Sequence, residues 1–281
     1  AQDDKSDQKD PFYIAERTRT RLPAAAWSPQ LDFLPLRFYT RARFHLVQQL
    51  AREKSYFTAF LFLKASAYRV LRPFSDLWGS TSRLILGEHP SLDELAALPV
   101  QQLADQLYQL SGHHLPHPLN NARKLQQIAT DSFDLPPQLI EPVQRILDVT
   151  LAHVTFLETQ IALVEQWITA EALHLPAVRW LSSIPGIGPV FSSGIAAEIG
   201  DVQRFLQGTK WDPERKRFRA RNLRDAEDAV AKIARLWWPR HSSGDFEAQD
   251  RRMAKSGNRY LRYYLVQAAN QLRQHVPEYA S

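Results

Sequence analysis

Residues 137–170 read PQLIEPVQRILDVTLAHVTFLETQIALVEQWITA, and this stretch has the most regular hydrophobic pattern in the chain. Its inward positions recur at alternating steps of four and three residues: Val143, Leu147, Thr150, Val154, Leu157, Ile161, Val164 and Ile168. That spacing is the a/d pattern of a heptad, which places one seam along one face of an α-helix. The stretch therefore predicts a long helix whose seam packs against another helix.

Two partners for this seam are open from the sequence. A second helical pattern runs from Leu36 to about Leu71 and ends before Pro73. Its second half, Phe57 to Leu63, is apolar on nearly all sides, which indicates a buried helix. The seam is expected either to pack on this helix as an antiparallel hairpin within one chain or to pair with a second chain. We slightly favour dimerisation.

The remaining patterns are helical as well. Ser91-Leu-Asp-Glu94 is a capping box that opens a short helix, further helices are expected at residues 100–110 and 121–130, and residues 73–90 are expected to be loop and turn. Asn258 to about Gln274 predicts a final helix. The predicted fold class is mainly α, with a long helical (coiled-coil) hairpin followed by a small helical C-terminal domain.

Composition limits the classes of function. The chain has 281 residues, of which 44% are hydrophobic, so it can bury a substantial core. The net charge is +5, and the surplus of Lys and Arg is concentrated between Arg204 and Arg262, which favours a polyanionic partner. The absence of cysteine excludes disulfides and thiolate chemistry. We see no signal peptide and no apolar run that would span a bilayer, so we expect a cytoplasmic protein without a membrane partner.

Three histidines, His113, His114 and His117, lie in the polar stretch from residues 111 to 118. Histidines at this spacing could bind a metal ion. No carboxylate lies close to them in sequence, so we favour a polar loop.

Residues 184–189 read Ile-Pro-Gly-Ile-Gly-Pro, which is typical of the loop of a helix-hairpin-helix motif. Pro189 suits the first position of a helix. Gly186 and Gly188 carry no side chain, so free backbone N–H groups at that helix start can hold a phosphate. Such binding would be independent of base sequence. The alternative is a plain turn between two helices, and we favour phosphate binding.

Residues 210–224, KWDPERKRFRARNLR, are densely basic with two interleaved aromatic residues. Cations hold phosphates and aromatic rings stack on bases, so the composition suits nucleic acid. A solvated basic helix explains it equally well.

Residues 236–262 read LWWPRHSSGDFEAQDRRMAKSGNRYLR and combine hydroxyl, glycine and cationic groups. The Ser243 hydroxyl directly precedes Gly244, and glycine lets a phosphate approach the backbone. Arginine grips phosphate oxygens in a planar fork. A surface turn beside a solvated basic face is the alternative for each part. The cations expected to bind nucleic acid are Arg240, Arg251, Arg252, Lys255, Arg259 and Arg262.

These motifs resemble the insertion-sequence transposases that carry a RuvC-like domain with four carboxylates followed by a serine-bearing transposase domain, the bridge-RNA-guided serine recombinases. Order and spacing agree over about a hundred residues. The matching residues are Ile184–Pro189, Asp201, Arg204-Phe205, Leu236-Trp-Trp-Pro239, Ser243-Gly244 and Lys255-Ser-Gly-Asn-Arg-Tyr-Leu-Arg262. One departure is Arg235, which stands where such proteins usually have glycine before the Leu-aromatic-Pro run.

The resemblance implies a transposase that recombines DNA through a covalent serine–phosphate link. Ser243 is the expected nucleophile and Ser242 the second choice. Asp7 and Asp10 match the two aspartates at the end of the RuvC-like domain and would bind Mg²⁺. From the residues alone they would be an acidic helix cap. The resemblance also implies a guide RNA that selects DNA sites, and a helical segment that joins two subunits as a homodimer or higher oligomer.

Three segments are expected. Residues 1–22 would be the C-terminal remnant of the RuvC-like domain, with its other carboxylates upstream of this chain. Residues 23–175 would form the helical, coiled-coil domain, and residues 176–281 the transposase domain. Two other functions stay open: a helical dimer that binds nucleic acid without cutting it, and an inactive, truncated transposase.

Overall fold

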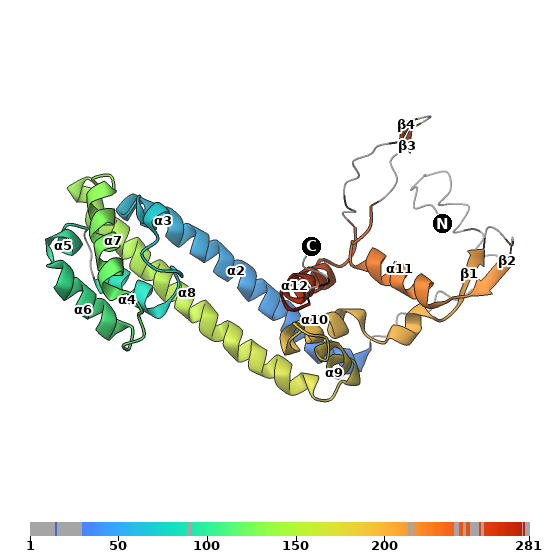
Figure 1. Ribbon diagram of the computed structural model, residues 1–281. Coiled ribbons are helices and arrows are strands. Elements are labelled where there is room, and N and C mark those ends of the chain that lie inside the picture. The colour runs from blue at the N-terminus through green and yellow to red at the C-terminus, as the bar shows by residue number, and fades with distance from the viewer. Residues whose placement is uncertain are drawn as a thin grey trace.

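The computed structural model describes residues 15, 30–88, 92–212, 215, 217–238, 242–243, 246–247, 253, 256–276 and 278. This part of the chain is mainly helical, as predicted. Figure 1 shows an elongated molecule in which two long helices, α2 (Leu34–Lys64) and α8 (Pro137–Ala172), connect a helical lobe at one end to the C-terminal helices at the other.

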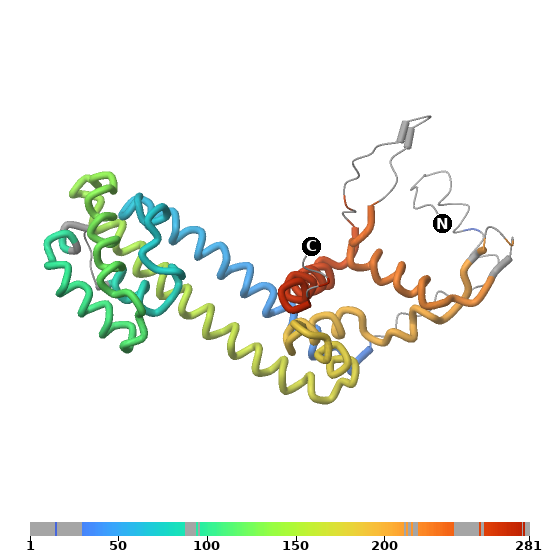
Figure 2. The backbone as a smooth tube through the Cα atoms, in the orientation of Figure 1, coloured from blue at the N-terminus to red at the C-terminus, as the bar shows by residue number. Residues whose placement is uncertain are grey.

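Helices α2 and α8 lie side by side and antiparallel over most of their length (Figure 2). All eight predicted seam residues of α8 are buried. Ion pairs flank the seam, with Arg43 Nε 2.7 Å from Glu165 Oε1 and Lys54 Nζ 2.9 Å from Glu158 Oε1. The hairpin within one chain is therefore confirmed. Because α2 already covers the seam, the seam gives no support for a second chain, and the homodimer stays a prediction.

The lobe contains five short helices: α3 (Tyr68–Leu71), α4 (Ser80–Glu88), α5 (Leu92–Ala97), α6 (Val100–Leu110) and α7 (Pro118–Asp131). The predicted helix to Leu71 is wrong at its end, since α2 stops at Lys64 and α3 is separate. The prediction of loop for residues 73–90 is also wrong, because Ile85 and Leu86 of α4 are buried in the lobe core.

Lys64 ties α2 to the lobe. Its ammonium group donates hydrogen bonds to the Leu86 carbonyl (3.2 Å) and to Gln144 Oε1 (2.7 Å), so it joins α2, α4 and α8. Burial disfavours the charged form and lowers the pKa of Lys64 to about 8. Since the ammonium group is buried, hydrogen bonds to protein atoms replace those that water would otherwise make with it.

The C-terminal region begins with α9 (Pro176–Ser182), α10 (Pro189–Ile199) and the 3-10 turn η2 (Val202–Phe205). A two-stranded antiparallel ribbon follows, β1 (Thr209–Asp212) with β2 (Arg217–Ala220), and leads into α11 (Leu223–Ile233). The last elements are β3 (Ser242–Ser243), β4 (Phe246–Glu247) and α12 (Arg259–His275). A further 3-10 turn, η1 (Leu31–Phe33), precedes α2.

Close packing of α10 on α12 joins this region to the hairpin. A Cβ on Gly194 would lie 2.4 Å from the ring of Tyr264, so only glycine fits there. Tyr264 is fully buried, and its hydroxyl donates to the Thr40 carbonyl of α2 at 2.7 Å. Burial raises the pKa of Tyr264 above its ordinary value. One side chain therefore bridges α10, α12 and α2.

Among the described residues, α8 is long and apolar enough to cross a membrane by length and composition, in contrast to the expectation that no apolar run would span a bilayer. Its apolar seam packs on α2 within the chain. The apolar seam residues of α8 are thus buried against α2 inside the hairpin.

Candidate nucleic-acid interface

The turn between α9 and α10 requires its first glycine. Gly186 has a φ of +82°, a conformation that side chains disfavour. A Cβ there would also lie 3.1 Å from both the Gln271 carbonyl and His275 Nδ1 of α12. Gly188 is the N-cap of α10, and Pro189 follows at the first helical position. The expected helix, tight turn and helix are present, and the last turn of α12 packs on the turn.

A cavity of about 490 Å³ opens over this turn. No side chain in the described part of the chain caps the start of α10, so the first N–H groups of this helix can bind an anion. His275 Nδ1 lies 2.9 Å from the Gln271 carbonyl, and a carbonyl only accepts, so Nδ1 is the donor. The cavity is lined by Ser182, Ser183, Ile184, Pro185, Gly186, Ile187, Gly188, Phe191, Gln271 and His275. It can accept a phosphate group.

A buried carboxylate fixes the start of α12. Glu198 of α10 is only 3% exposed and receives two hydrogen bonds from Arg41 of α2, at 2.7 and 2.8 Å. This hydrogen bonding raises the pKa of Arg41 above its ordinary value. Glu198 also accepts from Asn258 Nδ2 at 2.5 Å, while Asn258 Oδ1 accepts from the N–H groups of Tyr260 and Leu261. These hydrogen bonds hold the start of α12 firmly.

The loop between α11 and α12 is closed at its base. Asn258 N–H donates to the Ile233 carbonyl at 2.6 Å, and Arg235 Nε donates to the Gly257 carbonyl at 2.7 Å. Gly257 has a φ of +130°, and a Cβ there would meet Ile233 O and Arg235 Cγ at 2.7 Å. Arg235 itself has a φ of +63°, which explains why glycine suits this position. Arg235 therefore fastens the base of the loop through this hydrogen bond.

Within the basic stretch from residue 210, the described residues form the β1–β2 ribbon, so the alternative of a solvated basic helix is wrong. Lys210 Nζ lies 2.6 Å from Asp225 Oδ1, and Arg219 Nη1 lies 2.6 Å from Asp225 Oδ2. Hydrogen bonds from Arg219 and Lys210 hold the pKa of Asp225 well below its usual range. These two cations hold the ribbon against α11. Arg221 and Arg224 are exposed and form no ion pair within the described part of the chain.

A family model described as Transposase IS116/IS110/IS902 family matches residues 178–210 and 219–281. The match supports an insertion-sequence transposase. No curated protein and no solved structure matched the chain. The matched segments contain the α9–α10 turn, α11, the closed loop and α12, and the gap between them falls in the β1–β2 ribbon. Since a transposase binds DNA, the exposed cations and the cavity over the turn are the candidate contacts.

Only some of the predicted site residues lie within the described part of the chain. Gly186 and Gly188 form the turn, and Ser242 and Ser243 form β3, paired with β4. Arg262 is half-buried on α12. The predicted residues outside the described part of the chain are Asp7, Asp10, Arg240, Arg251, Arg252 and Lys255.

Arg259 lies close to α2. Its guanidinium carbon is 5.8 Å from the ring centroid of Phe44 and 4.9 Å from that of Tyr260, and Nη2 donates to the Tyr260 hydroxyl. In this position the charge of Arg259 stabilises the contact of α12 with α2. A role for Arg259 in binding phosphate stays a prediction.

Sequence reasoning missed two groups of this region. Glu198 stood in the apolar run Ile195-Ala-Ala-Glu-Ile199, and a single acid in such a run was the available signal for a buried, paired carboxylate. Gln271 and His275 gave no signal, because their place over the turn depends on how α12 packs. Among the described residues, no group of three or more His, Cys, Asp or Glu could hold a metal ion.

Proposed function

We propose that this chain is a DNA transposase of insertion-sequence elements that becomes covalently linked to DNA through the hydroxyl of Ser243. The main support is the closed loop, which carries Ser243 and lies within the family-matched region. Long loops held on a rigid base are where catalytic residues are often found.

The base of this loop is suited to presenting a reactive group. Two hydrogen bonds hold its ends together, and Asn258 on one end is fixed by Glu198 of α10. The α10 helix also begins at the cavity over the α9–α10 turn. A phosphate bound at that cavity would therefore hold the nucleic acid on the same rigid group of helices that carries the loop.

In the proposed reaction, Ser243 Oγ forms a bond to a backbone phosphorus of DNA. The bond from that phosphorus to one deoxyribose oxygen breaks, and this oxygen leaves as a hydroxyl after taking up a proton. Arg251, Arg252 and Lys255 would offset the negative charge that builds up on the phosphate. A serine hydroxyl is a weak nucleophile at neutral pH, so as the bond to phosphorus forms it gives its proton to a base, for which we propose a carboxylate of the RuvC-like domain.

Asp7 and Asp10 are the residues that we propose hold Mg²⁺. Carboxylate oxygens are the ligands Mg²⁺ prefers, so the donor types fit, although both residues lie outside the described part of the chain. When bound, the ion would supply a Lewis acid for phosphate chemistry.

A guide RNA is the second part of the proposal and rests on the resemblance. If pairing with RNA selects the DNA site, the protein needs to hold only backbone and shape. The free N–H groups at the start of α10 suit such sequence-independent contact.

The test mixes the full-length protein with the DNA and RNA of its element and Mg²⁺. We expect a protein–DNA band that survives denaturing electrophoresis, is lost in Ser243→Ala and persists in Ser242→Ala. If the band is lost in Ser242→Ala and persists in Ser243→Ala, the nucleophile is Ser242. If the wild type binds DNA with a steep salt dependence and never forms the band, the protein is a binding module and not a recombinase.

A further inference from the structure

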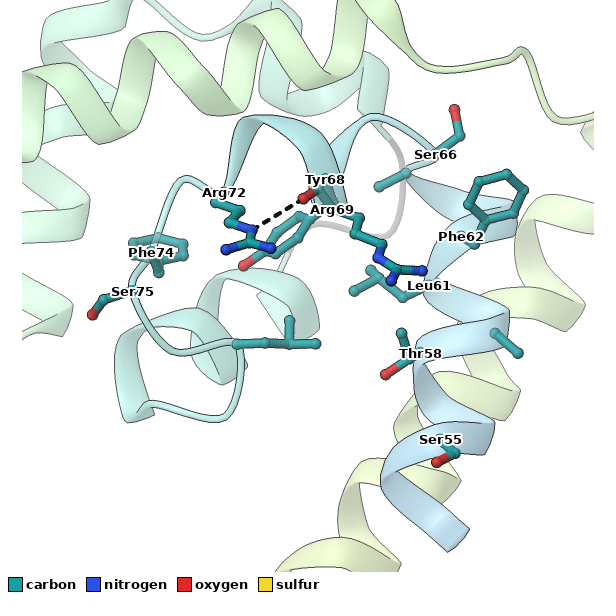
Figure 3. A pocket seen from close by; sticks show the side chains of 13 residues that line it. Ser55, Thr58, Leu61, Phe62, Ser66, Tyr68, Arg69, Arg72, Phe74 and Ser75 are labelled. Carbon is teal, nitrogen blue, oxygen red and sulfur yellow. Dashed lines mark hydrogen bonds between the residues drawn. The ribbon is translucent and has the colours of Figure 1, made fainter. Parts of the chain in front are cut away.

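A second cavity lies at the other end of the hairpin. It has a volume of about 620 Å³ and opens where the end of α2, the turn after it, α3 and the following loop meet (Figure 3). Leu61, Ala65 and Tyr68 are buried and form its floor. Phe62, which is 53% exposed, and Phe74 add two aromatic rings to its lining. This is an open pocket with aromatic walls.

Cations without acidic partners edge this pocket. Arg69 of α3 and Arg72, the residue that follows α3, line it, both are exposed, and neither forms an ion pair in the part of the chain that the structure describes. No carboxylate is among its lining residues. In Figure 3 the Arg69 side chain extends toward α2, while Arg72 lies on the side of Phe74. The pocket therefore suits a ligand with negative charge.

The backbone of Arg72 strengthens the case for a binding site. Its φ of 42° places it in the left-handed region, where glycine would be unstrained. Strained residues of this kind are concentrated at ligand sites. Lys124 Nζ donates to the Arg72 carbonyl at 3.4 Å and brings a third cation close.

Hydroxyl groups along α2 offer acceptors to the same ligand. Ser55 Oγ donates to the Ala51 carbonyl at 2.9 Å, and Thr58 Oγ1 donates to the Lys54 carbonyl at 2.7 Å. Each hydroxyl has thus used its proton and keeps lone pairs that can accept from an amino or hydroxyl group.

We propose that this pocket binds an unpaired nucleotide of a single-stranded nucleic acid. The base would stack on the exposed ring of Phe62, as bases do on exposed aromatic rings in single-strand binders. Arg69 and Arg72 would bind the adjoining phosphates through their planar forks. A base within a duplex already has both faces stacked and its edge paired, so only an unpaired one can enter. An acidic peptide would use the cations but leave the aromatic walls without a partner.

The position of the pocket deepens the proposed function, on which this part rests. Helix α2 has 31 residues and at a rise of about 1.5 Å per residue is roughly 45 Å long. The pocket lies at its C-terminal end, and α10 and α12 pack near its N-terminal end (Figure 1). A strand held by both ends of the molecule must therefore extend over most of that length.

The test compares two matched double variants of the full chain. The first removes an arginine and an aromatic ring of the pocket, Phe62→Ala with Arg69→Ala. The second removes the same residue types from exposed positions on α8, Phe156→Ala (57% exposed) with Arg145→Ala (76% exposed side chain). Binding of single-stranded RNA, single-stranded DNA and duplex DNA is measured by fluorescence anisotropy at several salt concentrations, and thermal unfolding is followed for each variant.

We expect the pocket variant to lose roughly tenfold in affinity for a single strand, in line with the loss of one stacked base. The α8 variant should bind as the wild type does, and both should keep the wild-type unfolding temperature within a few degrees. A strand carrying 4-thiouridine or 4-thiothymidine should cross-link on irradiation to the peptide that contains residues 55–77. The RNA and DNA strands show which sugar the pocket accepts.

Equal loss in the two variants, no loss in either, or cross-links elsewhere would overturn the proposal. A loss confined to duplex DNA would also overturn it. The covalent assay on Ser243 separates this result from the proposed function. If the pocket variant binds normally while the Ser243 link forms, only the pocket proposal fails. If the pocket binds a strand and no link ever forms, the transposase mechanism fails instead.

Discussion

Arg235 shows how one side chain can offset the cost of its own backbone. A left-handed backbone costs a non-glycine residue roughly 1–2 kcal/mol. Arg235 adopts this conformation and donates Nε to the Gly257 carbonyl at 2.7 Å, a hydrogen bond whose net contribution is about 1 kcal/mol. The hydrogen bond of the side chain thereby offsets part of the backbone strain that a glycine at this position would avoid.

Arg235→Ala keeps the strained backbone and loses the hydrogen bond, so we expect the free energy of unfolding to fall by about 1 kcal/mol. Arg235→Gly loses the bond but also the strain and should stay within roughly 0.5 kcal/mol of wild type. Urea denaturation measures both, with Arg221→Ala as the exposed arginine control. Equal losses in the alanine and glycine variants would refute the strain argument.

The lowered pKa of Lys64 makes the stability of the protein depend on pH. Burial lowers its pKa in the folded protein to about 8 from 10.5. Between these values the unfolded chain binds more protons than the folded one, so the free energy of unfolding rises with pH. The rise should approach roughly 3 kcal/mol by the upper end of the window.

Lys64→Met removes the titrating group and should remove this rise. Because the lost hydrogen bonds of Leu86 and Gln144 are the same at every pH, they shift the whole profile and not its slope. Denaturation of wild type and variant at pH 7 to 10 gives the difference directly. Parallel profiles would mean that Lys64 is charged in the folded protein throughout this range.

At the level of elements, the start of α12 is stabilised mainly by the side chain of its N-cap residue, Asn258. Asn258 caps the helix with its carbonyl oxygen and donates its amide to the buried Glu198. Asn258→Ala should lower the free energy of unfolding by about 1–2 kcal/mol, since it removes the cap and one partner of Glu198. Asn258→Asp keeps a capping oxygen but places a second carboxylate beside Glu198, so it should be the less stable variant at pH 7.

Asn222→Asp is the matched control for Asn258→Asp. Asn222 caps α11, and the neighbouring Asp225 is already bound by Lys210 and Arg219. Those cations should make an added carboxylate tolerable there. If both aspartate variants lose the same stability, the buried Glu198 is not the cause.

Elements with a local repeat could be predicted from the sequence, and elements formed by distant contacts could not. The seam from Val143 to Ile168 repeats every turn, so the helix and its buried face followed from the pattern. Helix α4 has no such repeat in its sequence. Ile85 and Leu86 are buried there by contacts with helices that are distant in sequence, and a local pattern does not show such contacts. The pairing of Lys210 with Arg219 in the β1–β2 ribbon is local, but the basic composition of the stretch did not indicate strands.

The same limit applies to the candidate site. Gly186 was recognisable because the tight turn needs its positive φ, whereas Gly188 has a φ of −75° and open space where a Cβ would lie. Glu198 meets Arg41 across 157 positions of sequence, a pairing that no local pattern records. The placement of Ser243 relative to the cations after it stays a prediction.

At the scale of the whole molecule, the hairpin separates two places where nucleic acid would bind. The lobe has its own core of buried residues, and the C-terminal helices have another, joined by α2 and α8 (Figure 1). Because the seam between these helices is filled within one chain, a homodimer would have to use other surfaces. The central claim concerns the C-terminal end, where a closed loop carries Ser243.

Mass spectrometry of the protein–DNA product tests that claim most directly. After the linked DNA is digested with nucleases and the protein with trypsin, a nucleotide should remain attached to Ser243. We expect this adduct in the wild type and none in Ser243→Ala. An adduct on any other side chain, or a DNA product made without a protein link, would contradict it.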